Sequence, residues 1–313
     1  MTPPLPRRLR SWTLLLAPAA VVLVSLPSVA ARTQAADKTI FIGVVDAAGK
    51  GVPGLTVKDV AVREDNVDRE VTSVKPASQP LYLYILGDTS RQAGNQGMMG
   101  RETASGGTEL IRDIRNSLAE GVKKLFEQSP DSQVAVMEFG QAAITITKFT
   151  NKAADVTKGI NRLFPKPEAG SVLLEALVDA SKNLAKVPSQ RRAIISINIE
   201  PGEEESRQEP QKILDALRDS GATLWSVSLQ KGQLRNPSRD IVLNRLTQIS
   251  GGRREFLIGP SAIENMTKLY VDILCSQYEV TYKRPASSAK VEAVQVGVAR
   301  PGLKVHASAF APK

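Results

Sequence analysis

The chain has 313 residues, of which 42% are hydrophobic and 23% are charged, a balance typical of folded proteins rather than disordered ones. The formal net charge is +9, and the sequence contains one cysteine, Cys275, and one histidine, His306. These counts exclude an intrachain disulfide, a cysteine-rich zinc site and a metal site built from several histidines. The length accommodates one large domain or two modest ones.

Residues 1–30 have the pattern of a secretory signal peptide. Three arginines precede an uncharged run at 11–31, and small residues at 28–30 suit cleavage after Ala30 or Ala31. We therefore expect a periplasmic or secreted bacterial protein without stable membrane insertion after cleavage. The alternative is an uncleaved anchor, because the run is just long enough to span a bilayer.

Cleavage would leave a modest positive charge. It would remove three arginines and no acidic residue, so the net charge falls from +9 to +6. The remaining lysines and arginines form no dense block, and aromatic residues make up only 4% of the chain. We therefore expect a solvated basic surface and no nucleic-acid site.

Residues 38–76 predict an N-terminal β segment. The run at 39–45 is β-branched and apolar, the glycines at 49 and 51 mark a turn, and isolated valines recur among polar residues after it. A proline-bounded linker at 76–80 ends the segment.

Residues 80–275 predict an α/β domain. The run at 81–86 (LYLYIL) is continuously apolar, as in a strand buried on both faces, and 193–199 (AIISINI) is expected to be the next buried strand. Leucine and isoleucine recur at helical spacing over 108–128. Further strands are expected at 134–139, 144–149, 222–229 and 254–257, and further helices at 152–164, 172–186, from about 210, at 239–249 and at 261–275. This alternation predicts a doubly wound, mostly parallel sheet with helices on both faces.

Residues 276–313 predict a C-terminal β segment with strands at 277–284, 291–298 and 303–310. Both ends of the chain thus carry strands that need partners. We expect them to pair as a small β-sandwich, with the α/β domain inserted between its halves. His306 lies in the last strand, where we expect a packing role.

Polar residues follow the predicted strands where the strands end. Asp88 and Ser90 follow the first buried strand, Ser171 precedes an apolar helix, and Glu200 ends a later strand. Carboxyl ends of parallel strands meet at one edge of a sheet, so these residues are expected to converge on one patch.

This layout resembles the von Willebrand factor type A domain, in which Asp-x-Ser-x-Ser, a threonine and an aspartate hold a metal ion that binds a partner's carboxylate. The whole chain resembles the VWFA-related proteins described from Acidobacteria. The matching segments are Val45-Asp46-Ala-Ala-Gly49 through Glu64-Asp65, Gly251-Gly252-Arg253, Gln277-Tyr278, and Arg300-Pro301-Gly302-Leu303-Lys304-Val305. The resemblance implies a binding module and not an enzyme.

The departures from the family pattern fall on the metal site. Asp88 and Ser90 match, but Arg91 and Gln92 replace glycine and the second serine. Ser171 stands for the threonine and Glu200 for the aspartate. A degenerate site for Mg²⁺ or another divalent cation remains one alternative, and no other cofactor is expected.

The other alternative is that the Arg91 guanidinium replaces the cation between Asp88 and Glu200. Arg91 could instead point to water. The acidic run at 203–205 reads as a solvated loop, with calcium binding as the less favoured interpretation.

The expected function is that of an exported, non-enzymatic, adhesion-type module. An unidentified protein ligand would contact Arg91, Asp88, Ser90 and Glu200, with the 93–107 loop as a rim. The second interpretation is an envelope- or carbohydrate-binding protein that uses its basic surface and β unit. An enzyme ranks third, because the single histidine lies far along the chain from every strand-end serine and no phosphate loop or nucleophile elbow occurs.

Overall fold

The computed structural model describes residues 35–94, 106–200, 202–230, 236–286 and 291–312. The expected signal peptide and most of the 93–107 loop therefore lie outside the described residues. Within the described part, no helix combines the length and apolar character needed to cross a bilayer.

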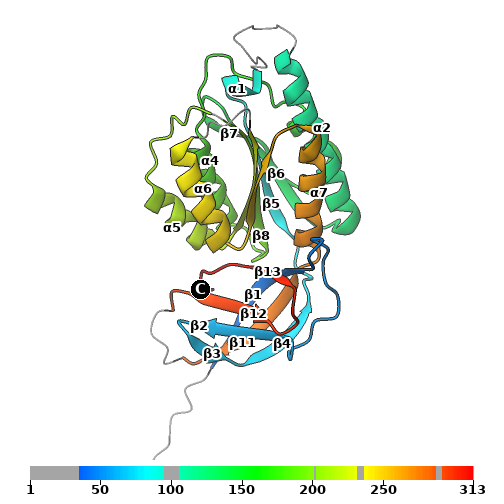
Figure 1. Cartoon of the computed structure of the whole chain (residues 1–313), viewed down its shortest axis with the longest axis vertical. Helices are drawn as coiled ribbons and strands as arrows, with labels where there is room; N and C mark the ends of the chain where they lie inside the picture. The colour runs from blue at the N-terminus through cyan, green and yellow to red at the C-terminus, as the bar shows by residue number, and fades with distance from the viewer. Residues whose placement is uncertain (1–34, 95–105, 201, 231–235, 287–290, 313) are drawn as a thin grey trace, which may run out of the picture. The chain divides into compact units, whose positions relative to one another are not determined.

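A six-stranded sheet forms the centre of the α/β domain (Figure 1). Its strand order is β10-β9-β8-β5-β6-β7. Neighbouring strands pair in parallel, except that β7 runs antiparallel to β6. The strands are β5 (Tyr82–Gly87), β6 (Gln133–Phe139), β7 (Ala143–Thr150), β8 (Arg192–Glu200), β9 (Thr223–Gln230) and β10 (Arg253–Leu257).

Helices cover both faces of this sheet. They are α1 (Arg91–Gly94), α2 (Gly106–Gln128), α3 (Ala153–Ile160), α4 (Leu173–Leu184), α5 (Pro210–Ser220), α6 (Pro237–Ile249) and α7 (Ser261–Cys275). Successive side chains of β5 explain the two layers: Leu83 and Ile85 pack with α2, α3 and α7, whereas Tyr84 and Leu86 pack with α4, α5 and α6. The predicted doubly wound, type A-like fold is confirmed.

Strands from both ends of the chain pair with one another, as expected. The strands are β1 (Ala36–Val45), β2 (Val60–Glu64), β3 (Val67–Arg69), β4 (Val71–Pro76), β11 (Tyr278–Arg284), β12 (Val294–Val298) and β13 (Lys304–Ala307). They form two antiparallel sheets, of orders β13-β1-β11-β4 and β12-β2-β3. One hydrophobic core lies between them and includes Ile42, Val62, Val280 and Val294.

A buried arginine binds both linkers between the β strands and the α/β domain. The Arg191 side chain donates from Nη1 to the Gln79 carbonyl at 3.1 Å and from Nε to Gln277 Oε1 at 3.0 Å. Gln79 precedes β5 and Gln277 precedes β11, so the entry and exit of the α/β domain share one anchor.

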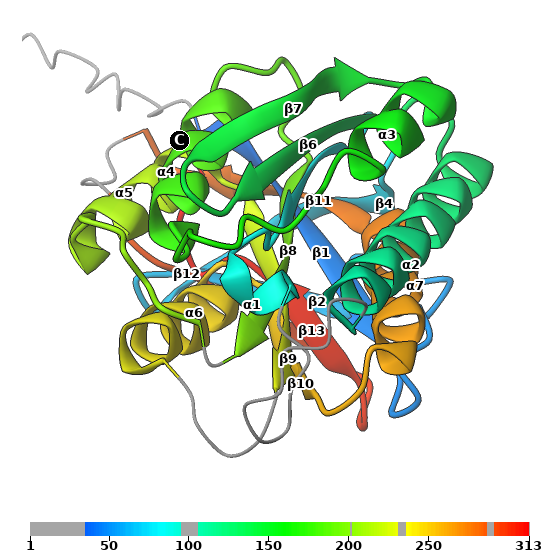
Figure 2. The same cartoon turned by 90° about the horizontal axis from the view of Figure 1, so that it is seen from above.

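The parallel strands β5, β6, β8, β9 and β10 end at the same edge, which we call the carboxyl edge. Figure 2 looks down on it and shows α1 lying across the strand ends. The residues that the sequence singles out follow these strands.

Candidate functional site

Asp88, directly after β5, ties two strand ends together. Its Oδ1 accepts a hydrogen bond from the Ser90 backbone N–H at 3.0 Å, and its Oδ2 accepts one from the Ile199 N–H at 3.1 Å. The side chain is fully buried. The carboxylate therefore fixes the loop after β5 against the end of strand β8.

Backbone hydrogen bonds join the loops that were expected to converge. The Ser171 N–H donates to the Glu203 carbonyl, and the Glu205 N–H donates to the Ser171 carbonyl, both at 2.7 Å. The Arg91 N–H donates to the Ala169 carbonyl at 2.8 Å. The segments around residues 88–91, 169–171 and 199–205 thus form one assembly at the carboxyl edge.

Burial corrects the expected mode of binding. Asp88, Ser90, Ser171 and Glu200 each have 0% of their surface exposed, so their side chains cannot contact a partner directly. Gln92 lies on α1 and is partly exposed. Of the residues predicted to touch a ligand, only Arg91 presents its side chain to solvent, with 35% exposed.

The cation between the acidic residues is a different arginine from the expected one. Arg91 pairs through Nη2 with Glu203, whose side chain is 61% exposed. Arg239, on α6, is fully buried instead. Its Nη1 lies 3.7 Å from both Asp88 Oδ2 and Glu200 Oε1.

Further contacts hold the Arg239 guanidinium. Its Nε donates to Glu204 Oε2 at 2.7 Å, and its Nη1 donates to the Ile199 carbonyl at 3.2 Å. Burial lowers the pKa of Arg239, but Asp88, Glu204 and Glu200 outweigh this effect and leave the pKa above its ordinary value. The guanidinium is therefore permanently charged.

A second arginine approaches Glu200 from β10. The Nη2 of Arg254 lies 3.6 Å from Glu200 Oε1, and its Nη1 donates to Asp240 Oδ1 at 2.6 Å. Burial raises the pKa of Glu200, while the charges of Arg239 and Arg254 partly offset that effect. Glu200 is thus a desolvated carboxyl group between two guanidinium groups.

Hydrogen bonds at the start of α6 fix the position of Arg239. Asn236 caps the helix by accepting the Arg239 N–H on Oδ1 at 3.1 Å. Its Nδ2 donates to the Gly202 carbonyl at 2.6 Å. A Cβ at Gly202 would lie 2.3 Å from Arg239 Nη1, so only glycine leaves room for the guanidinium.

Two members of this buried cluster, Arg239 and Glu204, were not predicted from the sequence. Arg239 lies in a predicted helix, where an arginine ordinarily faces solvent, and Glu204 lies in the acidic run that was read as solvated. For Glu204 the solvated interpretation is wrong, because its side chain is only 3% exposed, whereas Glu203 and Glu205 are exposed as predicted. The available signal was an Asn-Pro helix start with an arginine three residues after the cap.

The arrangement does not fit a divalent cation. The hydroxyls of Ser90 and Ser171 are buried without hydrogen-bond partners and would suit one chemically, but the Arg239 guanidinium already lies beside both acidic residues. A divalent ion about 4 Å from that charge would be opposed by about 8 kcal/mol at an effective dielectric of about 20. Within the described ranges, no group of three or more His, Cys, Asp or Glu side chains is placed to hold a metal.

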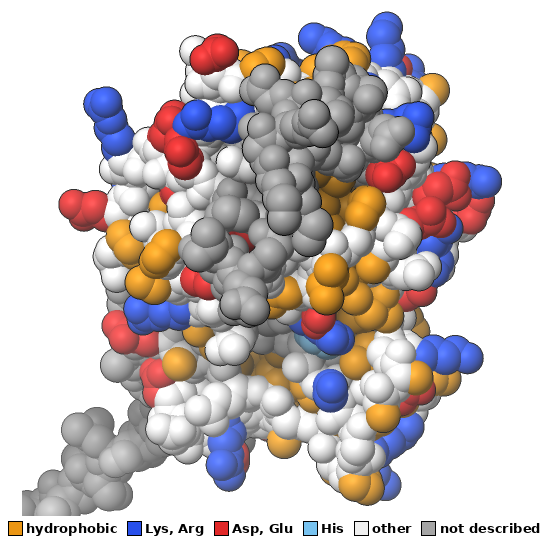
Figure 3. Space-filling model, turned by 45° about the horizontal axis from the view of Figure 1, so that its top comes forward, with side chains coloured by type: hydrophobic (Ala, Val, Ile, Leu, Met, Phe, Trp, Pro, Cys, Tyr) orange, Lys and Arg blue, Asp and Glu red, His pale blue; other side chains and the backbone are white. Residues whose placement is uncertain are grey.

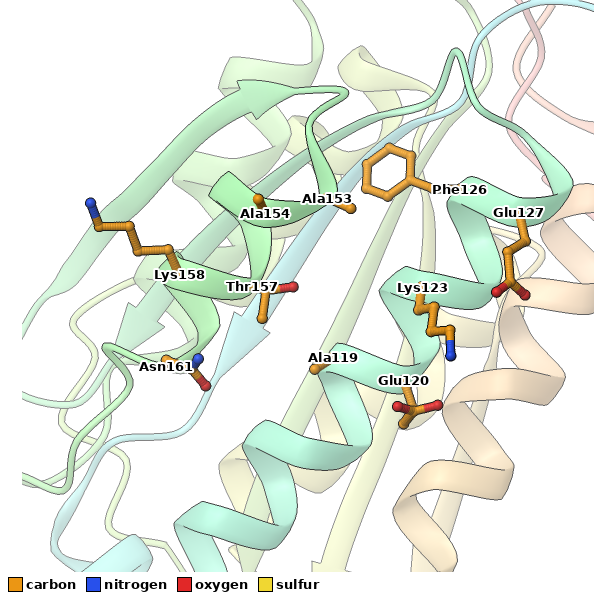
Figure 4. Close-up of a pocket in the computed structure, with 10 residues that line it drawn as sticks. All are labelled: Ala119, Glu120, Lys123, Phe126, Glu127, Ala153, Ala154, Thr157, Lys158 and Asn161. Atoms are coloured by element: carbon orange, nitrogen blue, oxygen red, sulfur yellow. The ribbon is translucent and has the colours of Figure 1, made fainter.

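A separate groove lies between α2 and α3 (Figure 4). It has a volume of about 860 Å³, and Phe126 points into the gap between the two helices. The lining also includes Ala119, Ala153 and the charged Lys158 at the rim. None of the carboxyl-edge residues lines this groove.

The single histidine and the single cysteine of the chain lie away from the carboxyl edge. His306, on β13, packs its ring 5.1 Å from that of Trp225, and burial lowers its pKa. Cys275 ends α7, and burial raises the pKa of its thiol to about 11. His306 has the packing contact expected from its place on a strand.

The sheet order, the crossover helices and the loops at the carboxyl edge together define a von Willebrand factor type A-like fold. No protein-family model matches the sequence, and no curated protein matches it.

Solved structures with some likeness include proximal thread matrix protein 1 from the mussel byssus, at 18% identity and a TM-score of 0.48, over 63% of this chain and 48% of that one. A von Willebrand factor type A protein from Catenulispora acidiphila has 12% identity and a TM-score of 0.46, over 84% and 76%. The SpRpn10 VWA domain has 8% identity and a TM-score of 0.43, over 60% and 94%. The chain spans about half of the mussel protein, and these likenesses carry no conclusion about function.

Proposed function

We propose that this chain is an exported, non-enzymatic protein-interaction module of the VWFA-related type, which binds a partner protein at the carboxyl edge. The observation that carries the proposal is the joining of three loops into one fixed assembly by the Asp88 carboxylate and by backbone hydrogen bonds. A surface that is ordered before binding loses less conformational entropy when a partner docks.

The contact surface in this proposal consists of exposed neighbours of the buried cluster. Phe164, in the loop after α3, is 53% exposed, and the Arg115 guanidinium lies 4.7 Å from its ring centre. Arg91, Glu203 and Lys166 also present side chains there. Aromatic residues and arginine dominate the binding energy of many protein interfaces, so Phe164 and Arg91 are the proposed anchors.

Binding is preferred to catalysis because of where the reactive side chains lie. His306 packs against Trp225, and the Cys275 thiol has a raised pKa that disfavours the nucleophilic thiolate. Neither residue belongs to the loops of the carboxyl edge. The proposal therefore assigns those loops to docking.

The second candidate is binding to an anionic envelope component or a carbohydrate through the basic surface and the β unit. The charge excess of the chain favours it. On the face in Figure 3, however, positive and negative side chains are interspersed, which argues for the first candidate.

A pair of photo-crosslinking variants separates the two candidates. Phe164 at the carboxyl edge and Val67 in the β unit are each 53% exposed, so a crosslinking residue at either position is equally accessible. With the envelope fraction of the producing cell, the proposal predicts a discrete protein adduct from position 164 and none from position 67. Adducts from position 67 alone would favour the second candidate.

Salt gives an independent readout. A shape-specific interface should survive about 1 M salt, where the Debye length is about 3 Å, whereas binding to a general basic surface should disappear. Adduct formation from position 164 that vanishes in high salt would contradict the proposal.

A further inference from the structure

The Arg239 guanidinium occupies a fully enclosed acidic cage. Asp88 follows β5, Glu200 ends β8, and Glu204 lies in the next loop, so the three carboxylates come from segments up to 116 positions apart in sequence. Their side chains are 0%, 0% and 3% exposed. An uncompensated charge at such depth is strongly unfavourable, so a cation is needed to keep these groups buried.

The cage is shaped for this particular side chain. Gly202 leaves the space that the guanidinium fills, and Asn236 joins the Gly202 carbonyl to the start of α6. The Ile199 carbonyl accepts a hydrogen bond from Nη1. Three independent features therefore meet at Arg239: a charge cage, a steric slot and a helix cap that sets the position of its backbone.

We propose that Arg239 is a built-in cation that holds the loops after β5 and β8 together, and that the carboxyl edge consequently orders without a divalent metal ion. A guanidinium cannot lose its proton in a protein and cannot dissociate from the chain. The order of the edge is thus independent of the metal concentration outside the protein. This inference concerns the edge itself and holds whichever partner binds there.

The first test is titration of the full chain with Mg²⁺ and with Mn²⁺, followed by calorimetry and by the thermal unfolding midpoint. The expected result is no binding heat at micromolar to millimolar metal and no shift of the midpoint in metal or in EDTA. Micromolar binding that raises the midpoint and is lost in Asp88→Ala would overturn the proposal.

The second test replaces the guanidinium by an uncharged, unbranched side chain. Arg239→Met leaves three buried carboxylates without their main cation, so its urea midpoint should fall several times further than that of Arg245→Met. Arg245 lies on the same helix but is exposed, so it is the matched control. Equal midpoints for the two variants would overturn the proposal.

A third variant serves if Arg239→Met yields no soluble protein. Gly202→Ala keeps every charge but places a Cβ 2.3 Å from Arg239 Nη1, whereas at Gly259 the nearest atom to an added Cβ, outside the adjacent residues, is Ser261 Oγ at 4.0 Å. Gly202→Ala should therefore lower the midpoint well below that of Gly259→Ala. If Gly202→Ala is as stable as the control, the guanidinium does not occupy the slot and the proposal fails.

Discussion

Glu64 offers a sharp test of how the two ends of the chain hold together. It lies on β2 with no exposed surface, and its partners come from β11 and β3. Tyr282 donates to Glu64 Oε1 at 2.5 Å, Arg284 Nε donates to the same oxygen at 2.8 Å, and Arg69 Nε donates to Oε2 at 3.0 Å. Replacement of Glu64 by glutamine keeps the shape and removes the charge.

The expected loss follows from what the substitution leaves behind. Breaking a buried ion pair by removing one partner costs about 3–5 kcal/mol, because the other charge stays unpaired. The Arg69 and Arg284 side chains keep 11% and 15% exposure, which allows partial hydration and favours the lower end of that range. We therefore expect Glu64→Gln to lower the free energy of unfolding by about 3 kcal/mol, or the thermal midpoint by about 6–12 °C.

The pH dependence gives a second readout with a definite sign. Burial raises the pKa of Glu64, but the hydrogen bonds from Arg284 and Tyr282 outweigh it and leave the pKa below its ordinary value. The stabilisation is therefore complete above the pKa of an unfolded glutamate, about 4.3, and is lost as the pH falls through the folded-state pKa. The difference between wild type and Glu64→Gln should shrink in that acidic range.

Urea unfolding followed by far-ultraviolet circular dichroism measures the effect. The control is Asp68→Asn, which breaks the ion pair with Arg63 on the same pair of strands. Those two side chains are 76% and 56% exposed, so the control should change stability by less than about 1 kcal/mol. If Glu64→Gln destabilises the protein no more than Asp68→Asn, the reasoning from burial is refuted.

Two further predictions concern the region around Cys275. Because burial raises the thiol pKa to about 11, iodoacetamide should label Cys275 slowly at neutral pH in the folded chain and rapidly in urea; equal rates would show that the thiol is not shielded. A chain that ends at Cys275 lacks β11, which pairs with both β1 and β4, so it should be insoluble, whereas a chain that ends at residue 311 should stay soluble. If the shorter chain folds as stably as the full one, the interpretation of the α/β domain as an insertion is wrong.

The fold could be predicted because its signals are local. The run that became β5 is apolar throughout, and the run that became β8 is apolar except at Ser196 and Asn198, as occurs when both faces of a strand are covered. The helix predicted at 261–275 has the bounds of α7. The convergence of the loops after β5 and β8 follows from parallel pairing, since adjacent parallel strands end at one edge. Hydrophobic periodicity was sufficient to predict the strands and helices, and parallel strand topology was sufficient to predict that the loops converge.

The partner of the acidic residues could not be predicted in the same way. Asp88 and Arg239 are 151 positions apart, and an arginine on a helix has the same local pattern whether it faces solvent or a buried cage. Arg91 was the nearer candidate in sequence, but it lies at the start of α1 and pairs with the exposed Glu203. The distinction depends on the space left by Gly202 and on the cap at Asn236, which are tertiary features.

The exchange of a metal ion for a tethered guanidinium changes how the carboxyl edge can bind. A divalent cation with an open coordination position can accept a carboxylate from a partner. Arg239 has no such accessible position: Nε donates a hydrogen bond to Glu204 and Nη1 donates one to the Ile199 carbonyl, while Nη2 has no hydrogen-bond partner but is buried with the rest of the side chain. The charge at the centre of the edge therefore orders the loops and cannot itself be a ligand site. If a partner binds there, its affinity must come from the exposed residues around the cage. Substitutions at Phe164 should therefore weaken binding without altering stability. Substitutions at Arg239 should lower stability first, and binding only as a consequence.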